Sequence, residues 1–170
     1  LGASWAILQP FMTMVVFTIF FGNLAEVPSD GVPYPIFTYA GLLPWQLFSK
    51  ALQDAARSLV SNRHMITKVY FPRLVLPLSS IVAGLVDFAI AFVVLLGLIA
   101  YYQMPLRIEM LTLPLFLLLG LVTALGVGLW FSALNVLYRD IAYVMPFIAQ
   151  FWMFITPVVY PASMVPEKWS

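Results

Sequence analysis

Residues 76–101 read LPLSSIVAGLVDFAIAFVVLLGLIAY, a long apolar run that holds a single charged side chain, Asp87. A helix rises 1.5 Å per residue, so about 20 largely apolar residues are needed to cross a hydrocarbon core of roughly 30 Å. Leu76–Tyr101 satisfies this requirement. The run therefore predicts a membrane-spanning helix.

Four further segments satisfy the same criterion: Trp5–Gly22, Pro35–Gln53, Leu111–Leu134 and Ile141–Tyr160. Pro35–Gln53 is the weakest of them, because Pro44 lacks an N–H and polar residues such as Lys50 interrupt the apolar pattern. A broken span or a re-entrant segment there remains open.

Composition fits this interpretation. Hydrophobic residues make up 63% of the chain and charged residues 9%, against about a quarter charged in a soluble domain. We expect an all-α, polytopic transmembrane helical bundle over residues 1–170, folded as a single domain. With no cysteine and one histidine, thiolate and imidazole metal sites are not expected. No set of catalytic side chains appears at a common depth, so we expect neither enzyme activity nor a cofactor in this chain.

The charges predict which side of the membrane each loop occupies, because cytoplasmic loops retain Lys and Arg. Placing the basic stretch between the second and third spans inside also puts Arg139 and Asp140, in the turn after the fourth span, inside. Six basic residues are then cytoplasmic and Arg107 and Lys168 are external. We therefore expect a cytoplasmic N-terminus. The odd number of spans suggests a sixth beyond Ser170.

The basic stretch reads ARSLVSNRHMITKVYFPRLVLP over residues 56–77. Cationic and apolar side chains alternate in it, which is typical of a short helix lying at the membrane surface. One interpretation is a loop that only sets topology. The other is a docking helix for a cytosolic partner.

Two features inside the spans also admit two interpretations each. Asp87 is either a hydrogen-bonding partner for a neighbouring helix or a group facing a water-filled path. Phe147, Phe151 and Phe154 fall at i, i+4 and i+7, on one side of a helix. They either pack against helices and lipid, or line a conduit along which sugar rings slide.

Four motifs together resemble the ABC-2 type transporter permeases, with the greatest similarity to the branch that exports lipid-linked polysaccharides such as O-antigen, capsule or teichoic acid. They are VPYPIFTYAGLLPWQLF (32–48), ITKVYFPRLVLPLS (66–79), SALNVLYRDI (132–141) and FWMFITPVVYPASMVP (151–166). The similarity covers the whole chain.

The resemblance implies six spans per subunit, a homodimer in the bacterial inner membrane, and a separate cytosolic ATPase that binds ATP and Mg²⁺. It implies an interface helix before Leu1, a coupling helix within Ser61–Arg73, and an external re-entrant segment over Tyr160–Trp169. The ATPase-coupling residues would be Ser61, Asn62, Arg63, His64, Lys68 and Arg73, and the conduit would include Phe147, Phe151, Phe154 and Tyr160. The cargo would be a polyprenyl-diphosphate-linked glycan, with membrane lipid around the dimer and no nucleic acid.

Three alternatives remain at this point. A small-molecule or drug exporter of the same superfamily would share the fold. A membrane-embedded glycosyl or acyl transferase would need acidic, His or metal-binding groups clustered at one membrane face, where the sequence offers only scattered single residues. A membrane scaffold without a conduit is the third.

Overall fold

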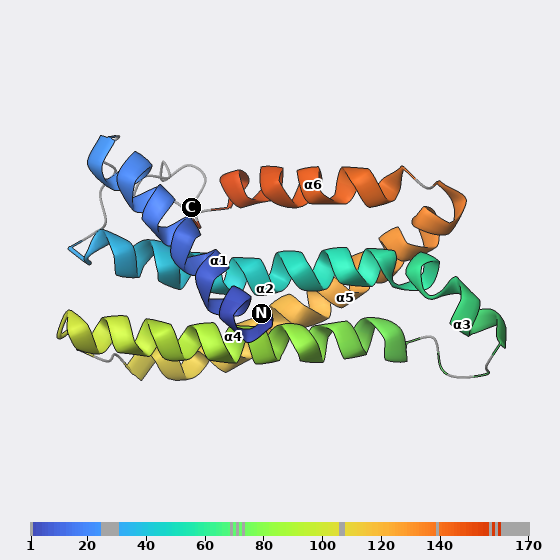
Figure 1. Ribbon diagram of the computed structural model, residues 1–170, viewed down its shortest axis with the longest axis horizontal. Helices are drawn as coiled ribbons and strands as arrows, with labels where there is room; N and C mark the ends of the chain where they lie inside the picture. Colours follow the sequence, from blue (N-terminus) through green and yellow to red (C-terminus); the bar gives the residue numbers. More distant parts are fainter. Residues whose placement is uncertain are drawn as a thin grey trace. The chain divides into compact units, whose positions relative to one another are not determined.

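The computed structural model describes residues 2–24, 31–68, 70, 72, 74–105, 108–138, 140–156, 158 and 160. The α-helices within them are α1 (Gly2–Phe17), α2 (Tyr34–Ser61), α3 (Arg63–Lys68), α4 (Val75–Tyr101), α5 (Leu113–Leu137) and α6 (Ile141–Ile155) (Figure 1). A π-helical segment, η1 (Thr18–Leu24), continues α1, and a 3₁₀ segment, η2 (Ile108–Thr112), precedes α5. The predicted all-α class is confirmed, and each predicted span coincides largely with a helix.

Helices α4 and α5 are long and apolar enough to cross a membrane. Their most apolar windows are only 22% and 6% buried, respectively. A core helix of a soluble protein of this length would be largely covered. Their exposed side chains, among them Val82, Val93, Leu118 and Val122, therefore suit contact with lipid.

Helix α2 answers the question raised by Pro44. It is one continuous α-helix of 28 residues, with Pro44 inside it. The helix is therefore not broken at the proline, and it continues to Ser61, eight residues beyond the predicted end at Gln53. Its length of about 42 Å exceeds the roughly 30 Å hydrocarbon thickness.

The chain forms two compact units, each assembled from separate segments. Unit 1 comprises Leu1–Trp45, Asp87–Arg107 and Phe151–Ser170, and unit 2 comprises Gln46–Val86 and Ile108–Gln150. Helices α2, α4 and α6 contribute to both units. The single-domain interpretation of residues 1–170 stays a prediction.

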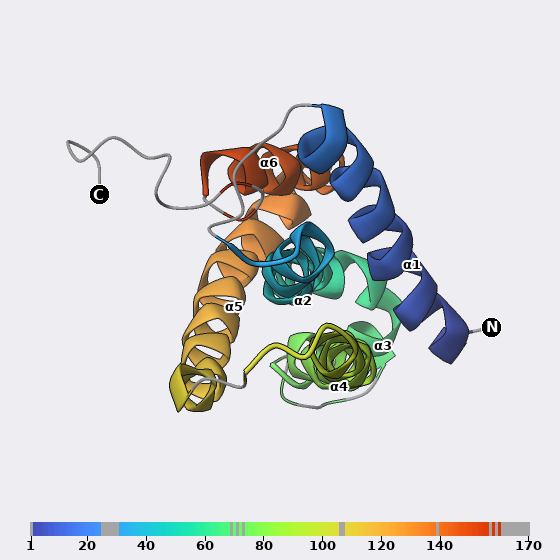
Figure 2. The ribbon, with the colours of Figure 1, turned by 90° about the vertical axis from the view of Figure 1, so that its left-hand side faces the viewer.

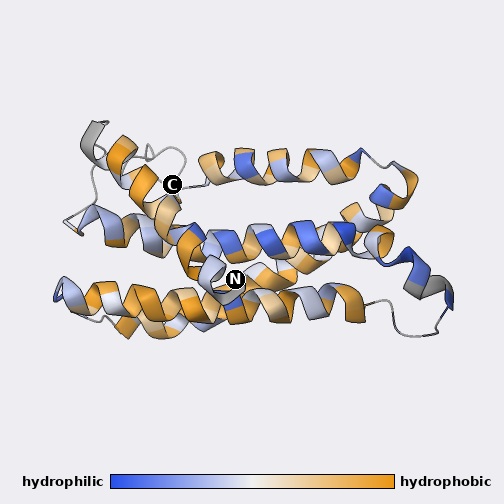
Figure 3. Ribbon diagram, viewed as in Figure 1, coloured by the Kyte–Doolittle hydropathy of each residue, from blue (hydrophilic) through white to orange (hydrophobic). Residues whose placement is uncertain are grey.

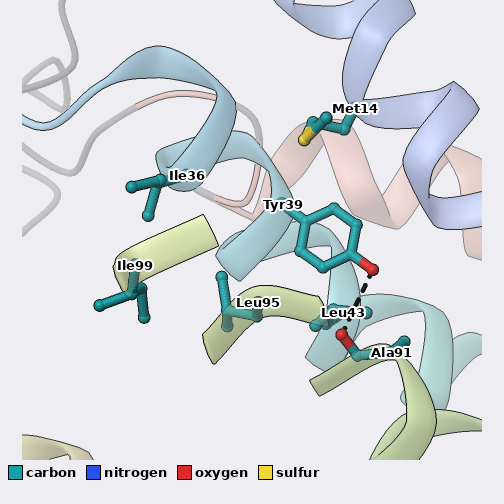
Figure 4. Close-up of a cluster of buried hydrophobic side chains, with 7 residues drawn as sticks. All are labelled: Met14, Ile36, Tyr39, Leu43, Ala91, Leu95 and Ile99. Atoms are coloured by element: carbon teal, nitrogen blue, oxygen red, sulfur yellow. Dashed lines mark hydrogen bonds between the residues drawn. The ribbon is translucent and has the colours of Figure 1, made fainter. Parts of the chain in front are cut away.

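Unit 1 has a core in which α2 packs against α4. Figure 2 shows these two helices nearly end-on, so their axes are roughly parallel, and the colours of Figure 1 show that the chain runs through them in opposite directions. Tyr39 is fully buried, and its phenolic oxygen donates a hydrogen bond to the Ala91 carbonyl oxygen at 3.3 Å (Figure 4). The other buried residues of this cluster are Met14, Ile36, Leu43, Leu95 and Ile99. The hydroxyl thus has a partner inside an otherwise apolar cluster, as a buried phenol requires.

Unit 2 is held by a close approach of α2 and α5. The buried residues of α5 are Ala124, Gly128, Ser132 and Asn135, and small residues every four positions let two helix backbones approach. A Cβ built on Gly128 would lie 2.6 Å from Ala55 Cβ and 3.1 Å from the Leu52 carbonyl oxygen. Glycine is therefore required there.

Candidate functional site

The sequence predicted a short helix within the basic stretch. Ala56–Ser61 belongs to α2, and Arg63–Lys68 forms the short helix α3 within the expected Ser61–Arg73 range. The Asn62 turn separates the two helices. Asn62 donates from Nδ2 to the Ser58 carbonyl oxygen at 2.9 Å, and its backbone N–H donates to the same oxygen at 3.3 Å. These bonds use a carbonyl at the end of α2, where helical carbonyls lack partners.

Helix α3 presents cations to its surroundings. Arg63, His64 and Lys68 are exposed, as is Ser61 at the end of α2, whereas Asn62 is half-buried. Arg73, the remaining predicted coupling residue, lies outside the described residues. The structure thus brings five of the six predicted coupling residues together at the end of α2 and in α3 (Figure 1), and their role in docking stays a prediction.

The turn between α5 and α6 is formed by Tyr138 and Asp140, with Arg139 outside the described residues. The Asp140 carbonyl oxygen accepts hydrogen bonds from the N–H groups of Tyr143 and Val144 at 3.0 and 3.2 Å. Asp140 therefore occupies the start of α6, where a carboxylate interacts favourably with the helix dipole. This gives the predicted cytoplasmic turn a structural role.

Exposed aromatic side chains recur along one side of α6. Phe147, Phe151 and Phe154 are 70%, 59% and 49% exposed, while Met145 and Ala149 on the same helix are buried. Sequence analysis missed Tyr143, which is 82% exposed and lies one helical turn before Phe147. The spacing of four residues between Tyr143 and Phe147 could have placed Tyr143 on the same side of the helix. We call Tyr143, Phe147, Phe151 and Phe154 the α6 aromatic face.

Tyr160 and Asp87 are the two other predicted residues that the structure describes. The Tyr160 hydroxyl donates to the Ile155 carbonyl oxygen at 3.2 Å, beside the end of α6. Asp87 is half-buried within α4. The rest of the predicted re-entrant segment lies outside the described residues.

Two long-range hydrogen bonds connect α2 to the helices around it in unit 2. Asn135 donates from Nδ2 to the Ala56 carbonyl oxygen at 3.2 Å, and Arg57 donates from Nη2 to the Ala142 carbonyl oxygen at 3.0 Å. Sequence reasoning placed Arg57 in the stretch whose two interpretations were a topology-setting loop and a docking helix, and it gave no role to Asn135. Ala56 and Ala142 are both far in sequence from the residues that bond to them, so no local sequence pattern could have revealed these hydrogen bonds.

Charges along the second half of α2 form a separate group. Asp54 is half-buried, with Lys50 four residues before it and Arg57 three residues after it. Within the described part of the chain, no three His, Asp or Glu residues gather into a metal site.

Together, the apolar exposed helices and the cationic helix α3 are those of a helical membrane protein. The whole chain, residues 1–170, matches the ABC-2 type transporter family. The chain belongs to that family, whose members are embedded in membranes.

Curated relatives have names that agree with this assignment. An O-antigen export system permease protein RfbA of Myxococcus xanthus is 33% identical over 99% of this chain and 64% of its own length. One of the same name from Klebsiella pneumoniae is 28% identical over 100% of this chain and 65% of its own. The polysialic acid transport protein KpsM of Escherichia coli is 25% identical over 100% of this chain and 67% of its own. The chain thus spans slightly less than two thirds of the length of the two O-antigen relatives.

Proposed function

We propose that this chain is the core of a permease subunit that exports a lipid-linked polysaccharide out of the cytoplasm across the bacterial inner membrane. The observation that carries the proposal is the family match over all 170 residues, joined to relatives named for O-antigen export and polysialic acid transport. A small-molecule exporter could belong to the same family, but these relatives are named for the transport of O-antigen and polysialic acid.

The energy would come from a partner. In this proposal a cytosolic ATPase binds ATP and Mg²⁺, two copies of the permease enclose the conduit, and a glycan on a polyprenyl diphosphate passes outward. The permease itself performs no chemistry. The N-terminus and α3 are cytoplasmic, as the six-to-two distribution of basic residues favours.

Helix α3 is the part of the chain best suited to contact the ATPase. Arg63 and Lys68 are exposed on a short helix, and Asn62 joins that helix to the end of α2 through the Ser58 carbonyl. A displacement of α3 would therefore act on α2 directly. Arg57 in turn links the last turns of α2 to the first turn of α6, which gives the movement a route to the aromatic helix.

Charge reversal on α3 tests this function. In the full-length permease, Arg63→Glu with Lys68→Glu should abolish co-purification of the cytosolic ATPase and stimulation of its activity, because like charges at a polar interface repel. Arg63→Lys with Lys68→Arg keeps both charges and serves as the matched control. Membrane insertion should be equal in the two variants. Retention of both ATPase binding and stimulation by the reversed variant would show that α3 does not dock.

A further inference from the structure

The second half of α2 has one polar side. Gln46, Ser49, Lys50, Gln53, Asp54 and Arg57 recur at spacings of three and four residues, which places them on one side of a helix. Lys50 and Arg57 are exposed and the other four are half-buried. Figure 3 shows hydrophilic residues along the right-hand half of α2, on the side turned to the viewer. We call these six residues the α2 polar face.

The opposite side of the same stretch is fully packed. Leu47, Ala51, Leu52, Ala55 and Ala56 are buried, and Leu52 and Ala55 meet Gly128 of α5. Most of the packing of α2 in unit 2 is therefore on this opposite side, and the α2 polar face joins a neighbouring helix through the hydrogen bond from Arg57 to the Ala142 carbonyl oxygen.

The exposed surface of unit 2 also differs between its helices. On α4 and α5 the exposed side chains include Val82, Val86, Leu118, Leu119 and Val122, which are suited to lipid. On α2 they are Lys50, Arg57 and Ser61. Charged and amide groups are costly in hydrocarbon, and those at membrane depth in natural proteins face a bundle interior or a water-filled cavity. Arg57 already donates to the Ala142 carbonyl oxygen and Gln53 to Ser49 Oγ, and the exposed parts of Lys50 and Arg57 suit water or an anion rather than hydrocarbon.

The side chains of this face suit a phosphate-bearing glycan. Lys50 and Arg57 carry two positive charges, and Asp54 between them carries at most one negative charge, so the face is cationic on balance. A guanidinium and an ammonium are the usual protein partners of phosphate. Gln53 donates from Nε2 to Ser49 Oγ at 3.0 Å, and such amides and hydroxyls can exchange hydrogen bonds with sugar hydroxyls.

We propose that the α2 polar face lines a water-filled, cytoplasmic section of the transport path and attracts the anionic phosphate group of the cargo. This inference rests on the proposed function, because it assigns the face to the path of that cargo. A polar segment of the whole protein outside this chain, or a second copy covering the face, would be the competing occupant.

Cysteine accessibility tests the proposal, since this chain contains no cysteine. Single variants Ser49→Cys and Gln53→Cys would be made in the full-length protein, with any cysteine outside this chain replaced. Inside-out membrane vesicles would be treated with an anionic (sulfonatoethyl) or a cationic (trimethylammonioethyl) methanethiosulfonate. Leu52→Cys, on the buried side of α2, and Val82→Cys, on the exposed apolar side of α4, are the controls.

We expect both charged reagents to modify Ser49→Cys and Gln53→Cys and neither control. For Gln53→Cys we compare the rate with the anionic reagent to the rate with the cationic reagent. This ratio of rates should be several-fold higher than the same ratio measured with a small thiol in solution. The ratio of the two rates cancels any change in the thiol's own pKa. Lys50→Gln should lower this ratio and Asp54→Asn should raise it.

Each other outcome overturns a defined part of the proposal. No modification of Ser49→Cys and Gln53→Cys means that protein or lipid covers the face, and the water path is wrong. If both variants are modified but the ratio of rates equals that of a small thiol in solution, and Lys50→Gln does not change it, the face does not attract anions. Neither result depends on ATPase binding or on glycan export, so failure here is distinguishable from failure of the proposed function.

Discussion

Arg57 donates a hydrogen bond from Nη2 to the carbonyl oxygen of Ala142 at 3.0 Å, across 85 positions of sequence. The bond joins the last turns of α2, directly before α3, to the first turn of α6. Arginine suits this position, because its guanidinium can serve one carbonyl and still present further donors to water or to a phosphate. A residue that the sequence suggested for docking thus has a partner inside the protein.

Replacement of Arg57 tests this connection. Arg57→Ala should lower the thermal unfolding midpoint of the purified protein, by the equivalent of about 1 kcal/mol, since the bond is charge-assisted but exposed. It should also weaken the stimulation of ATPase activity while ATPase binding persists. Arg63→Ala, at an exposed cation of α3, is the control for charge and should leave the midpoint unchanged. Equal midpoints for Arg57→Ala and the parent would remove the structural role.

The two glycines of Gly126-Val127-Gly128 should respond in opposite directions. At Gly128 a methyl group would meet Ala55 Cβ at 2.6 Å, whereas nothing lies within 4 Å of a Cβ at Gly126. Gly128→Ala should destabilise the protein by about 1–3 kcal/mol, because two packed helices must separate. Gly126→Ala should be neutral or stabilising by up to about 1 kcal/mol, since alanine favours a helix. Thermal unfolding in one detergent compares the pair, and equal destabilisation by both would contradict the close approach of α2 and α5.

Hydropathy predicted the helices well and their tertiary contacts poorly. The start of α4 differs from the predicted Leu76 by one residue and the start of α5 from Leu111 by two, because a long apolar run has few other stable forms in a membrane. Hydropathy does not distinguish Gly126 from Gly128, although a Cβ would meet α2 only at Gly128.

Helix α2 was harder to predict, because Lys50, Asp54 and Arg57 resemble the polar end of a span. They instead occupy one side of a helix that continues to Ser61. The partners of Arg57 and Asn135 are 85 and 79 residues away, and no periodicity within one helix contains such information. The conduit and docking assignments rest on exposure and resemblance, and they stay predictions.

Asn135 is a buried polar residue whose replacement should separate hydrogen bonding from packing. Its Nδ2 donates to the Ala56 carbonyl oxygen, while its own Oδ1 and the nearby Ser132 Oγ are buried with no hydrogen-bond partner in the described part of the chain. Asn135→Leu keeps the branched shape of the side chain and removes the unpaired oxygen, so it should cost less than about 1.5 kcal/mol. Asn135→Asp places a carboxylate against a carbonyl and should cost several kcal/mol. Equal stability of the two variants by thermal unfolding would show that this site is open to water.

Orientation can be measured with single cysteines in intact cells. Ser29→Cys and Glu109→Cys, in the two predicted external loops, should react with a membrane-impermeant maleimide. Ser61→Cys, at the exposed end of α2, should react only after permeabilisation. The reason is the retention of Lys and Arg on the cytoplasmic side. Reaction of Ser61→Cys in intact cells would reverse the topology, and docking of α3 to a cytosolic ATPase would then be excluded.

The α6 aromatic face decides between a polysaccharide conduit and a lipid-facing surface. Phe151 and Phe154 are 59% and 49% exposed, and flat aromatic rings offer sugars a contact without the fixed hydrogen bonds that would hold a moving polymer. Phe151→Ala with Phe154→Ala in the full-length protein should reduce surface polysaccharide and leave its lipid-linked precursor inside the cell. Expression and ATPase binding should be close to those of the parent. Phe151→Tyr with Phe154→Tyr keeps the rings and should retain export.

Leu118→Ala with Leu119→Ala is the matched control, because these side chains are 61% and 63% exposed on the apolar helix α5. A surface that only contacts lipid tolerates such truncation, so the α5 pair should export normally. Normal surface polysaccharide in the Phe151 and Phe154 double variant would remove this face from the conduit. Loss of the precursor itself, measured by extraction of the lipid-linked glycan, would point instead to a role in synthesis and hence to a membrane transferase. Only accumulation of precursor inside, with the tyrosine variant restoring export, fits a path along which the glycan slides.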